Sequence, residues 1–455
     1  MLIQTINPAT EEKLKAYPQT RGPEVDRTLK DAQAAFEDWR RLDFRERGSR
    51  LRKAAVLLRK HRDAHAKLMA LEMGKPFAQG QAESDKCAFV CDYFADHAER
   101  FLAAEKISTE ASRSFVAFQP LGVILAIMPW NFPFWQVFRF AAPALMAGNV
   151  VVVKPALNVS GCALALQTMM KASGLPAGVF NTLLIPQNRI GGLIKSPAIQ
   201  AVTLTGSVRA GKAVASQAGA ALKKTVLELG GSDPYVILKD CDLEKAVETC
   251  VQSRLINNGQ SCIAAKRFIV VKSIRRDFET LFTEKMNAAI MGDPCDTATT
   301  VGPLARKDLR DQLHSQVQRS VARGAKLLAG GKIPKRKGWY YPPTVLTDVR
   351  KGMAVYHEET FGPVAAIIPA GDEADAIRLA NDSAFGLGAA VFTRDRKHGE
   401  RIATAELEAG ACFVNEAVRS DPRLPFGGIK DSGFGRELGM FGIREFVNIK
   451  TVYVK

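Results

Sequence analysis

Hydrophobic residues follow two different patterns along this chain. In residues 24–104, apolar positions recur every three or four residues among Arg, Lys and Asp, which predicts amphipathic helices. Beyond this region, short uninterrupted apolar runs alternate with segments of helical spacing. Such runs are typical of strands that are buried on both faces of a parallel sheet covered by helices. The pattern therefore predicts an α/β protein.

The apolar runs form two series, so we expect two α/β lobes built from one interleaved chain, with a boundary near residues 228–231. The first predicted strands are Val123–Met128, Val150–Val153, Ala201–Thr205, Thr225–Leu229 and Tyr235–Leu238, with helices at Pro133–Ala147 and Asn158–Ser173. The later predicted strands are Phe268–Val271, Val364–Ile368, Ala389–Phe392 and Ala411–Asn415, with helices at Arg276–Ile290, Glu373–Asn381 and Lys397–Leu407. Two further strand-like segments, Ser114–Phe118 and Val447–Val454, are candidates for pairing between subunits.

One segment imitates a membrane span. Residues Leu121–Phe138 carry no charge, but Pro129 and Pro133 would break a spanning helix and leave backbone groups without partners in lipid. A buried strand, a sharp turn and a helix fit the segment better. The N-terminus has no pattern of a secretory signal. We expect a soluble protein with no membrane partner.

Composition and charge narrow the classes of function. Apolar residues make up 47% of 455 residues, which is ordinary for a globular chain. Lys and Arg total 63 against 47 acidic residues, a net charge of +16, but the positive residues are scattered. A diffuse charge argues against nucleic-acid binding and favours small anionic ligands. The eight cysteines form no CxxC pair, so we expect reduced thiols in the cytoplasm and no metal site.

A glycine-rich segment, Gly206–Ala213, nearly matches a phosphate-binding loop. It lies between a predicted strand and a predicted helix, but Ala213 stands where that loop needs a hydroxyl for magnesium, which argues against a kinase or an ATPase. Two interpretations remain open. The segment is either a site where a helix N-terminus binds a diphosphate, or a plain turn between strand and helix.

Five other segments carry candidate chemistry. They are Pro129–Pro133 with Asn131, Val153–Ala156 with Lys154, Leu227–Ser232 with Glu228, Asn257–Cys262, and Glu358–Pro363 with Glu359. The first three follow apolar strands, at the sheet edge where α/β proteins bind ligands. Cys262 lies in a polar, glycine-containing segment, which suits a nucleophile better than a core position does. Each segment alone could also be an ordinary turn or cap.

Taken in order, these segments resemble the aldehyde dehydrogenase superfamily over nearly the whole chain, from Asn7–Thr10 to Ser432–Gly433. Within it, Trp130–Arg139 and Ser432–Glu437 are most similar to the short bacterial succinate-semialdehyde dehydrogenases. The resemblance implies two Rossmann-like three-layer lobes with parallel sheets and a small β-extension for oligomerisation. It implies a cofactor-binding domain at 1–227, with 105–120 in an oligomerisation hairpin, a catalytic cysteine domain at 228–412, and a C-terminal return with an oligomerisation strand at 413–455.

The resemblance also implies a reaction in two stages. Cys262 matches the nucleophile that attacks the aldehyde carbon. The Asn131 side chain and the Cys262 backbone N–H match the donors that hold the developing oxyanion. Glu228 matches the general base that activates water to release the acid.

By the same resemblance, the cofactor is NAD or NADP. Lys154 matches the lysine on the adenosine ribose and Ser207 the serine on the diphosphate. Trp130, Glu359 and Phe361 match residues around the nicotinamide ribose and its cleft. At Leu157, relatives that prefer NAD often have a glutamate that binds the ribose hydroxyls. The leucine implies that NADP is tolerated or preferred.

The implied reaction is the oxidation of succinate semialdehyde to succinate. Arg139 and Ser420 match residues that bind the distal carboxylate, whereas Ile256 replaces a second arginine of longer relatives. The alternatives are a broad-specificity dehydrogenase of aliphatic or aromatic aldehydes, in which Arg139 is a structural cation, and a non-enzymatic member of the family. The family usually forms dimers or tetramers, so we expect a homodimer or homotetramer.

Overall fold

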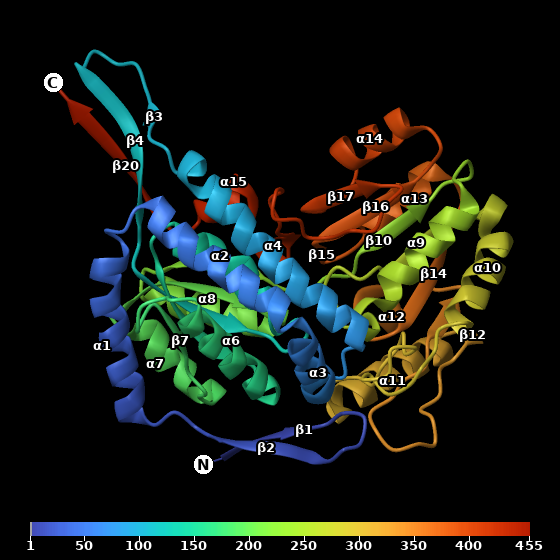
Figure 1. Cartoon of the computed structure of the whole chain (residues 1–455). Coiled ribbons are helices and arrows are strands. Elements are labelled where there is room, and N and C mark those ends of the chain that lie inside the picture. Colours follow the sequence, from blue (N-terminus) through green and yellow to red (C-terminus); the bar gives the residue numbers. More distant parts are fainter. Residues whose placement is uncertain (1) are drawn as a thin grey trace.

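The computed structural model describes residues 2–455 and has two α/β lobes joined side by side, with a β-strand arm projecting from the first (Figure 1). The fold predicted from the apolar runs is confirmed, since each lobe has a mostly parallel sheet covered by helices. No helix within residues 2–455 is both long and apolar enough to cross a bilayer.

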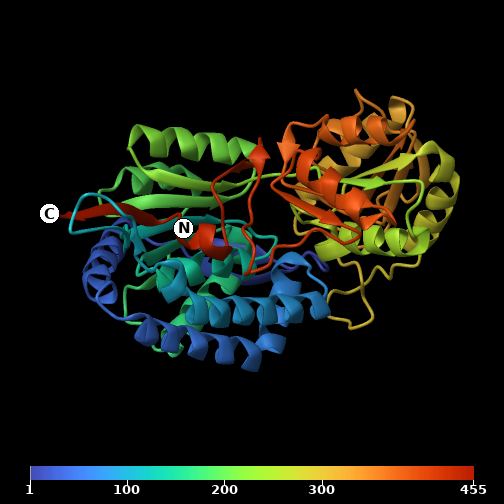
Figure 2. The same ribbon diagram turned by 90° about the horizontal axis from the view of Figure 1, so that it is seen from above.

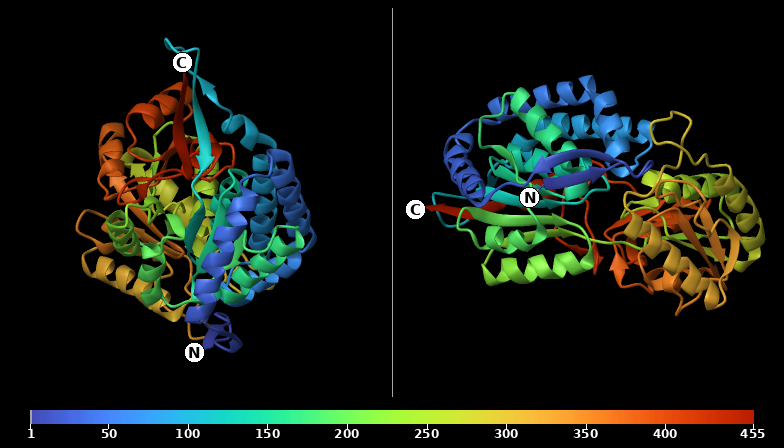
Figure 3. Two further views of the ribbon diagram at one scale, coloured as in Figure 1. Left: turned by 90° about the vertical axis from the view of Figure 1, so that its left-hand side faces the viewer. Right: turned by 90° about the horizontal axis from the view of Figure 1, so that it is seen from below.

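The N-terminal hundred residues form a hairpin and four helices. Their bounds are β1 (Leu2–Ile6), β2 (Lys13–Pro18), α1 (Gly22–Trp39), α2 (Phe44–Lys60), α3 (Arg62–Met73) and α4 (Phe77–Phe101). The helices begin and end at expected signals. Asp43 accepts a hydrogen bond from the Glu46 backbone and caps α2, and Gly74 ends α3 with a φ of 77°. The hairpin runs along the base of the molecule in Figure 1, so it faces the viewer in the view from below (Figure 3).

The first lobe contains a six-stranded sheet in the order β19-β9-β8-β5-β6-β7. Its strands and helices are β5 (Val123–Met128), α5 (Trp135–Met146), β6 (Val150–Pro155), η1 (Leu157–Val159), α6 (Ser160–Ala172), β7 (Phe180–Thr182), η2 (Gln187–Arg189), α7 (Ile190–Lys195), β8 (Ile199–Thr205), α8 (Val208–Ala220), β9 (Lys224–Glu228) and β19 (Gly433–Phe434). All pairs are parallel except β19 with β9. Because β5 lies between β6 and β8, the strand order reverses there, at the point where open α/β sheets bind ligands.

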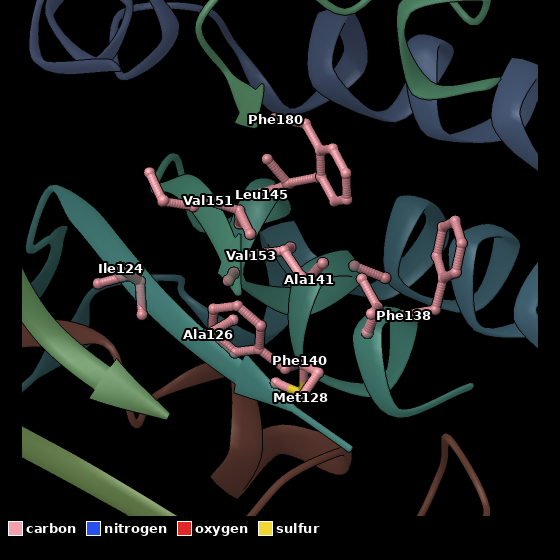
Figure 4. Close-up of a cluster of buried hydrophobic side chains, with 14 of the residues drawn as sticks. Ile124, Ala126, Met128, Phe138, Phe140, Ala141, Leu145, Val151, Val153 and Phe180 are labelled. Atoms are coloured by element: carbon pink, nitrogen blue, oxygen red, sulfur yellow. The ribbon is translucent and has the colours of Figure 1, made fainter. Parts of the chain in front are cut away.

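The core of this lobe lies on one face of the sheet, between β5, β6 and α5. Ile124, Val151 and Leu145 are fully buried and are among the side chains gathered there (Figure 4). Every residue of α5 is buried, because α2 and α4 pack over it. The uncharged segment 121–138 is thus a buried strand, a turn and the start of a buried helix, as predicted. From above, the green α8 covers the other face of the sheet (Figure 2).

The second lobe contains a seven-stranded sheet in the order β12-β13-β14-β11-β10-β16-β17. Its elements are β10 (Pro234–Ile237), α9 (Leu243–Leu255), η3 (Ile256–Gly259), β11 (Arg267–Val271), η4 (Lys272–Ile274), α10 (Arg275–Asn287), α11 (Lys307–Ala322), β12 (Lys326–Ala329), β13 (Thr344–Thr347), α12 (Ala354–His357), β14 (Val364–Ala370), α13 (Glu373–Asn381), β15 (Phe385–Gly386), β16 (Gly388–Phe392), α14 (Arg396–Ala405) and β17 (Ala411–Val414). Only β12 runs antiparallel to its neighbour.

After β17 the chain returns to the first lobe and ends in the arm. The return contains β18 (Ile429–Lys430), β19 and α15 (Gly439–Ile443), and the arm contains β3 (Glu105–Lys106), β4 (Arg113–Pro120) and β20 (Val447–Val454). The two segments proposed for pairing between subunits pair with each other inside the chain, since β4 and β20 form one antiparallel ladder (Figure 3). The free edge of β20 leaves a contact between subunits as a prediction.

Candidate active site

Cys262 lies in a turn whose backbone is unusually constrained. The residues before it, Asn257, Asn258 and Gly259, all have left-handed φ values of 52°, 59° and 75°. The left-handed turn brings Gly259 against the loop at Gly362, where a Cβ on Gly259 would lie 2.3 Å from the Gly362 carbonyl. The turn therefore fixes the cysteine relative to the segment that carries Glu359.

Lys266, which the sequence analysis did not single out, holds this turn from within. Its ammonium is almost fully buried and donates to the carbonyl oxygens of Ser261 (3.0 Å), Cys262 (2.7 Å) and Ala264 (3.1 Å). Burial raises the pKa of the Cys262 thiol to about 12, and the charges of Arg139 and Lys266 oppose that rise. The cysteine is thus a protonated thiol at neutral pH until a base takes its proton.

Asn131 is brought to the Cys262 turn from the other lobe. It follows β5, is buried, and its side-chain amide donates to the Gln260 carbonyl at 3.1 Å. Asn257 joins the two segments, because its amide donates both to the Asn131 carbonyl at 2.7 Å and to the Gln260 carbonyl at 3.0 Å. The predicted oxyanion donor and the predicted nucleophile therefore belong to one hydrogen-bonded unit.

Glu228, at the end of β9, is 2% exposed, and neither of its carboxyl oxygens has a hydrogen-bond partner within residues 2–455. The Arg139 guanidinium lies 3.9 Å from Glu228 Oε2 and forms a closer ion pair with Glu437. Burial raises the pKa of Glu228 well above its ordinary value, Arg139 opposes the rise, and Glu437 adds to it. A carboxyl group with a raised pKa and free oxygens is suited to receive a proton.

Arg139, predicted to bind the substrate, is thus 1% exposed and already paired with a carboxylate. It also donates to Thr205 Oγ1 at 3.4 Å and lies 4.6 Å from the centre of the Phe426 ring. Glu437 is the last residue of the motif Ser432–Glu437, but nothing in the sequence indicated its ion pair with Arg139. The substrate role of Arg139 stays a prediction.

Two of the predicted cofactor residues lie at the reversal of strand order in the first sheet. Lys154, near the end of β6, is buried, and burial alone lowers its pKa to about 8. No carboxylate pairs with its ammonium among the described residues. Ser207 caps α8 by accepting from the Ala210 backbone at 3.3 Å. In the same helix Gly211 allows close packing, because a Cβ there would lie 2.5 Å from Leu229 Cδ1. A buried ammonium without a carboxylate partner among the described residues fits a negatively charged ligand.

Leu157 opens η1, three residues after Lys154, and packs against a small cluster made by Ile3, Tyr17 and Leu184. This position therefore holds a packed apolar side chain and not the glutamate of the NAD-preferring pattern.

The other predicted cofactor residues come from both lobes. The rings of Trp130 and Phe361 meet edge to face, with centroids 5.6 Å apart. Glu359 accepts from the Gly231 backbone at 3.0 Å and lies 4.0 Å from the Lys266 ammonium. These contacts bring aromatic and acidic groups of the two lobes together, and their role toward a nicotinamide ribose stays a prediction.

Ser420, the remaining predicted residue, is buried and accepts two hydrogen bonds. Trp135 Nε1 donates to its Oγ at 3.1 Å, and Lys86 Nζ donates to the same oxygen at 3.0 Å. Lys86 comes from α4, and the sequence analysis gave it no role.

With this geometry in view, the comparisons with known proteins decide the family. The sequence profile of the aldehyde dehydrogenase family matches residues 1–452. The chain belongs to this family. The resemblance predicted from the motifs is confirmed.

Individual relatives are similar over their full length. The chain is 51% identical to a Synechocystis sp. protein named "Probable succinate-semialdehyde dehydrogenase [NADP(+)]", with 100% of each chain covered. It is 48% identical to the succinate semialdehyde dehydrogenase [NAD(P)+] of Escherichia coli, with 99% of this chain and 97% of that one covered. The solved structure of succinic semialdehyde dehydrogenase from Streptococcus pyogenes in complex with NADP+ superposes with a TM-score of 0.97 at 37% identity, covering 99% of both chains.

Proposed function

We propose that this aldehyde dehydrogenase oxidises succinate semialdehyde to succinate and uses NADP+ or NAD+. The observation that carries the proposal is that the Asn131 amide bonds within the Cys262 turn, while the charges of Glu228 and Arg139 both act on the half-buried Cys262 thiol. The names of the relatives at 48–51% identity support the choice of substrate.

In the first stage, the Cys262 thiol loses its proton to solvent, and Sγ then attacks the aldehyde carbon. The carbonyl oxygen gains negative charge, which the Asn131 amide and the Cys262 backbone N–H stabilise. Removing one such donor typically slows a reaction by about 10²–10³-fold. When bound, a nicotinamide dinucleotide supplies the hydride acceptor that the oxidation needs. Loss of hydride from the adduct leaves a thioester on Cys262 Sγ.

In the second stage, Glu228 takes a proton from water, and the resulting hydroxide attacks the thioester carbon. The C–S bond breaks, succinate leaves, and the thiolate takes the proton held by Glu228, which restores both the Cys262 thiol and the Glu228 carboxylate. Glu228 suits this role because burial favours its protonated form once the proton has been transferred. Arg139 opposes that effect, which keeps the carboxylate available to accept a proton.

The cofactor is held by residues at the reversal of strand order and at the cleft. We assign Lys154 and Leu157 to the adenosine ribose, Ser207 to the diphosphate, and Glu359, Trp130 and Phe361 to the nicotinamide end. Lys154 supports this assignment, because its buried ammonium lacks a carboxylate partner within the described part of the chain.

We also propose that Ser420 and Arg139 lie near the distal carboxylate of the bound substrate. Arg139 shares its charge with Glu437, so it contributes to the positive potential rather than forming a free binding fork.

Steady-state kinetics with two aldehydes of four carbons tests the proposal. We expect kcat/KM for succinate semialdehyde to exceed that for butanal by at least tenfold, with either NADP+ or NAD+ as acceptor. Equal values for the two aldehydes would favour the broad-specificity alternative.

Two further parts of the proposal concern the oligomeric state of the protein and its location in the cell. We infer a homodimer or homotetramer that forms through the arm, where the edge strand β20 exposes apolar side chains such as Ile449 and Tyr453. We also infer a cytoplasmic location, supported by eight cysteines that are all free.

A further inference from the structure

Lys86 brings a positive charge to Ser420. Its ammonium donates to Ser420 Oγ at 3.0 Å and lies 4.2 Å from the centre of the Trp135 ring. Trp135 opens α5, four residues after Asn131, and its Nε1 donates to the same Ser420 oxygen at 3.1 Å. An ammonium, an indole N–H and a hydroxyl therefore converge from three separate parts of the chain.

The ammonium of Lys86 has no carboxylate within 4.0 Å among residues 2–455, although it lies among several charges. Burial, together with the positive charge of Arg139, lowers its pKa to about 8. Glu83 and Cys87 on α4 and Asp421 beside Ser420 act in the opposite direction but less strongly. An added carboxylate would therefore stabilise the charged form of this lysine.

Lys86 also differs from Arg139 in access. Arg139 is 1% exposed and paired with Glu437, whereas Lys86 is partly exposed and bonded only to neutral groups. A carboxylate that reaches Ser420 can meet Lys86 without breaking an existing ion pair.

We propose that Lys86 is the specificity-determining residue that binds the distal carboxylate of the aldehyde, together with Ser420 and Trp135. This inference rests on the proposed function and adds a residue that neither the motifs nor the comparisons assign. A charged hydrogen bond is stronger than a neutral one, so the pocket prefers an aldehyde that ends in a carboxylate.

Lys86→Met, which removes the charge and keeps the length of the side chain, tests this role. We expect it to lower kcat/KM for succinate semialdehyde by about tenfold or more relative to butanal, mainly through KM. Lys86→Arg should recover part of the loss. The matched control is Lys67→Met on the exposed face of α3, which should leave both values unchanged.

The pH dependence of the same ratio gives a second readout that a purely structural role would not change. In the wild type, kcat/KM for succinate semialdehyde divided by that for butanal should fall as the pH rises through about 8, because Lys86 loses its charge. Ionisation of Cys262 affects both aldehydes and cancels. The ratio should be flat in Lys86→Met.

The outcomes separate this inference from the function on which it rests. If the wild type does not prefer succinate semialdehyde, the proposed function fails. If the wild type prefers it and Lys86→Met keeps the full preference with a flat pH ratio in both proteins, the role of Lys86 is overturned. Equal losses for both aldehydes with a lower Tm would also overturn it, because they indicate a structural lysine.

Discussion

At the scale of single residues, the site keeps ionisable groups where solvent cannot reach them. Glu228 and Glu437 are both about 97% buried and share Arg139 as their only cation within 4.0 Å in the described residues. Burial raises the pKa of each carboxyl group, and Arg139 limits the rise. Because two carboxyl groups share one guanidinium, the centre has too little positive charge for both to be ionised. This favours a proton on one of the two carboxyl groups.

The two stages of the reaction should respond differently to substitution. Cys262→Ala removes the atom to which the aldehyde carbon bonds, so no reduced cofactor should form. Glu228→Gln spares the attack on the aldehyde but removes the base for thioester hydrolysis. We expect a rapid burst of reduced cofactor followed by turnover slowed by about 10²-fold or more. Stopped-flow absorbance measures both phases, and a Cys262→Ala enzyme with normal turnover would exclude the mechanism.

Burial of Glu228 also predicts an effect on stability. The unfolded chain releases this proton near pH 4.5, but the folded protein holds it to a higher pH. The stability contributed by the protonated form is complete below pH 4.5 and is lost as the pH rises through the folded-state pKa. Glu228→Gln does not ionise, so its Tm should exceed that of the wild type by an amount that grows as the pH is raised from 4.5 toward neutrality. A Tm difference that is constant over this range would contradict the raised pKa.

At the scale of elements, sequence predicted the central strands well because they are buried on both faces. The predicted strand Val123–Met128 has the same bounds as β5, and Glu373–Asn381 has those of α13. Residues 291–347 gave no clear pattern, although they contain α11 and β13. The four residues of β13 are too few to show a period, and their place is set by pairing with β14.

The residues of the candidate site also divide into those that a local sequence motif marks and those that only the fold brings into place. Cys262, Asn131 and Glu228 stand in local motifs, so the sequence alone could single them out, and their roles stay a prediction. Lys86 could not be found, because its contact with Ser420 joins residues 334 positions apart and its own helix has no motif at that point.

The short helix η1 gives a prediction about cofactor choice. Leu157→Glu should shift preference toward NAD+, because a carboxylate can bind ribose hydroxyls and repels a 2′-phosphate by about 1–4 kcal/mol at ~4 Å. Leu157→Gln is the control, since it is polar without charge. Both variants should lose packing against Ile3 and Tyr17 and show a lower Tm. The measurement is the NADP+/NAD+ ratio of kcat/KM, and an unchanged ratio in Leu157→Glu would place this residue away from the ribose.

At the scale of the whole molecule, the two lobes and the arm have separate tasks. The lobes bring Asn131 and Cys262 together across their junction, and the arm carries exposed apolar residues away from both. Sequence analysis predicted both segments of the arm but not that they form one ladder in a single chain. Pairing over eight residues fixes a rigid apolar edge, as a subunit contact requires.

The arm predicts how the proposed assembly can be broken. Ile449 is 63% exposed, so Ile449→Glu should not disturb the fold of one chain but should place a charge in the proposed subunit contact. Light scattering should then give a mass near the 49.6 kDa of one chain. Val56→Glu on α2, which is similarly exposed, should leave the assembly intact. An unchanged mass in Ile449→Glu would exclude this part of the arm from the contact.

The pairing of β19 with β9 has a consequence for biosynthesis. Gly433 pairs with Glu228, and Glu437, which shares Arg139 with that base, follows four residues later. A nascent chain therefore presents Asn131, Glu228 and Cys262 before the segment that covers Glu228 has been made. Domains fold as they are made, at roughly 5–20 residues per second, so β9 lacks its β19 partner until synthesis has passed Gly433. A polypeptide that stops before Gly433 would leave the edge of β9 beside Glu228 unpaired and Arg139 without Glu437.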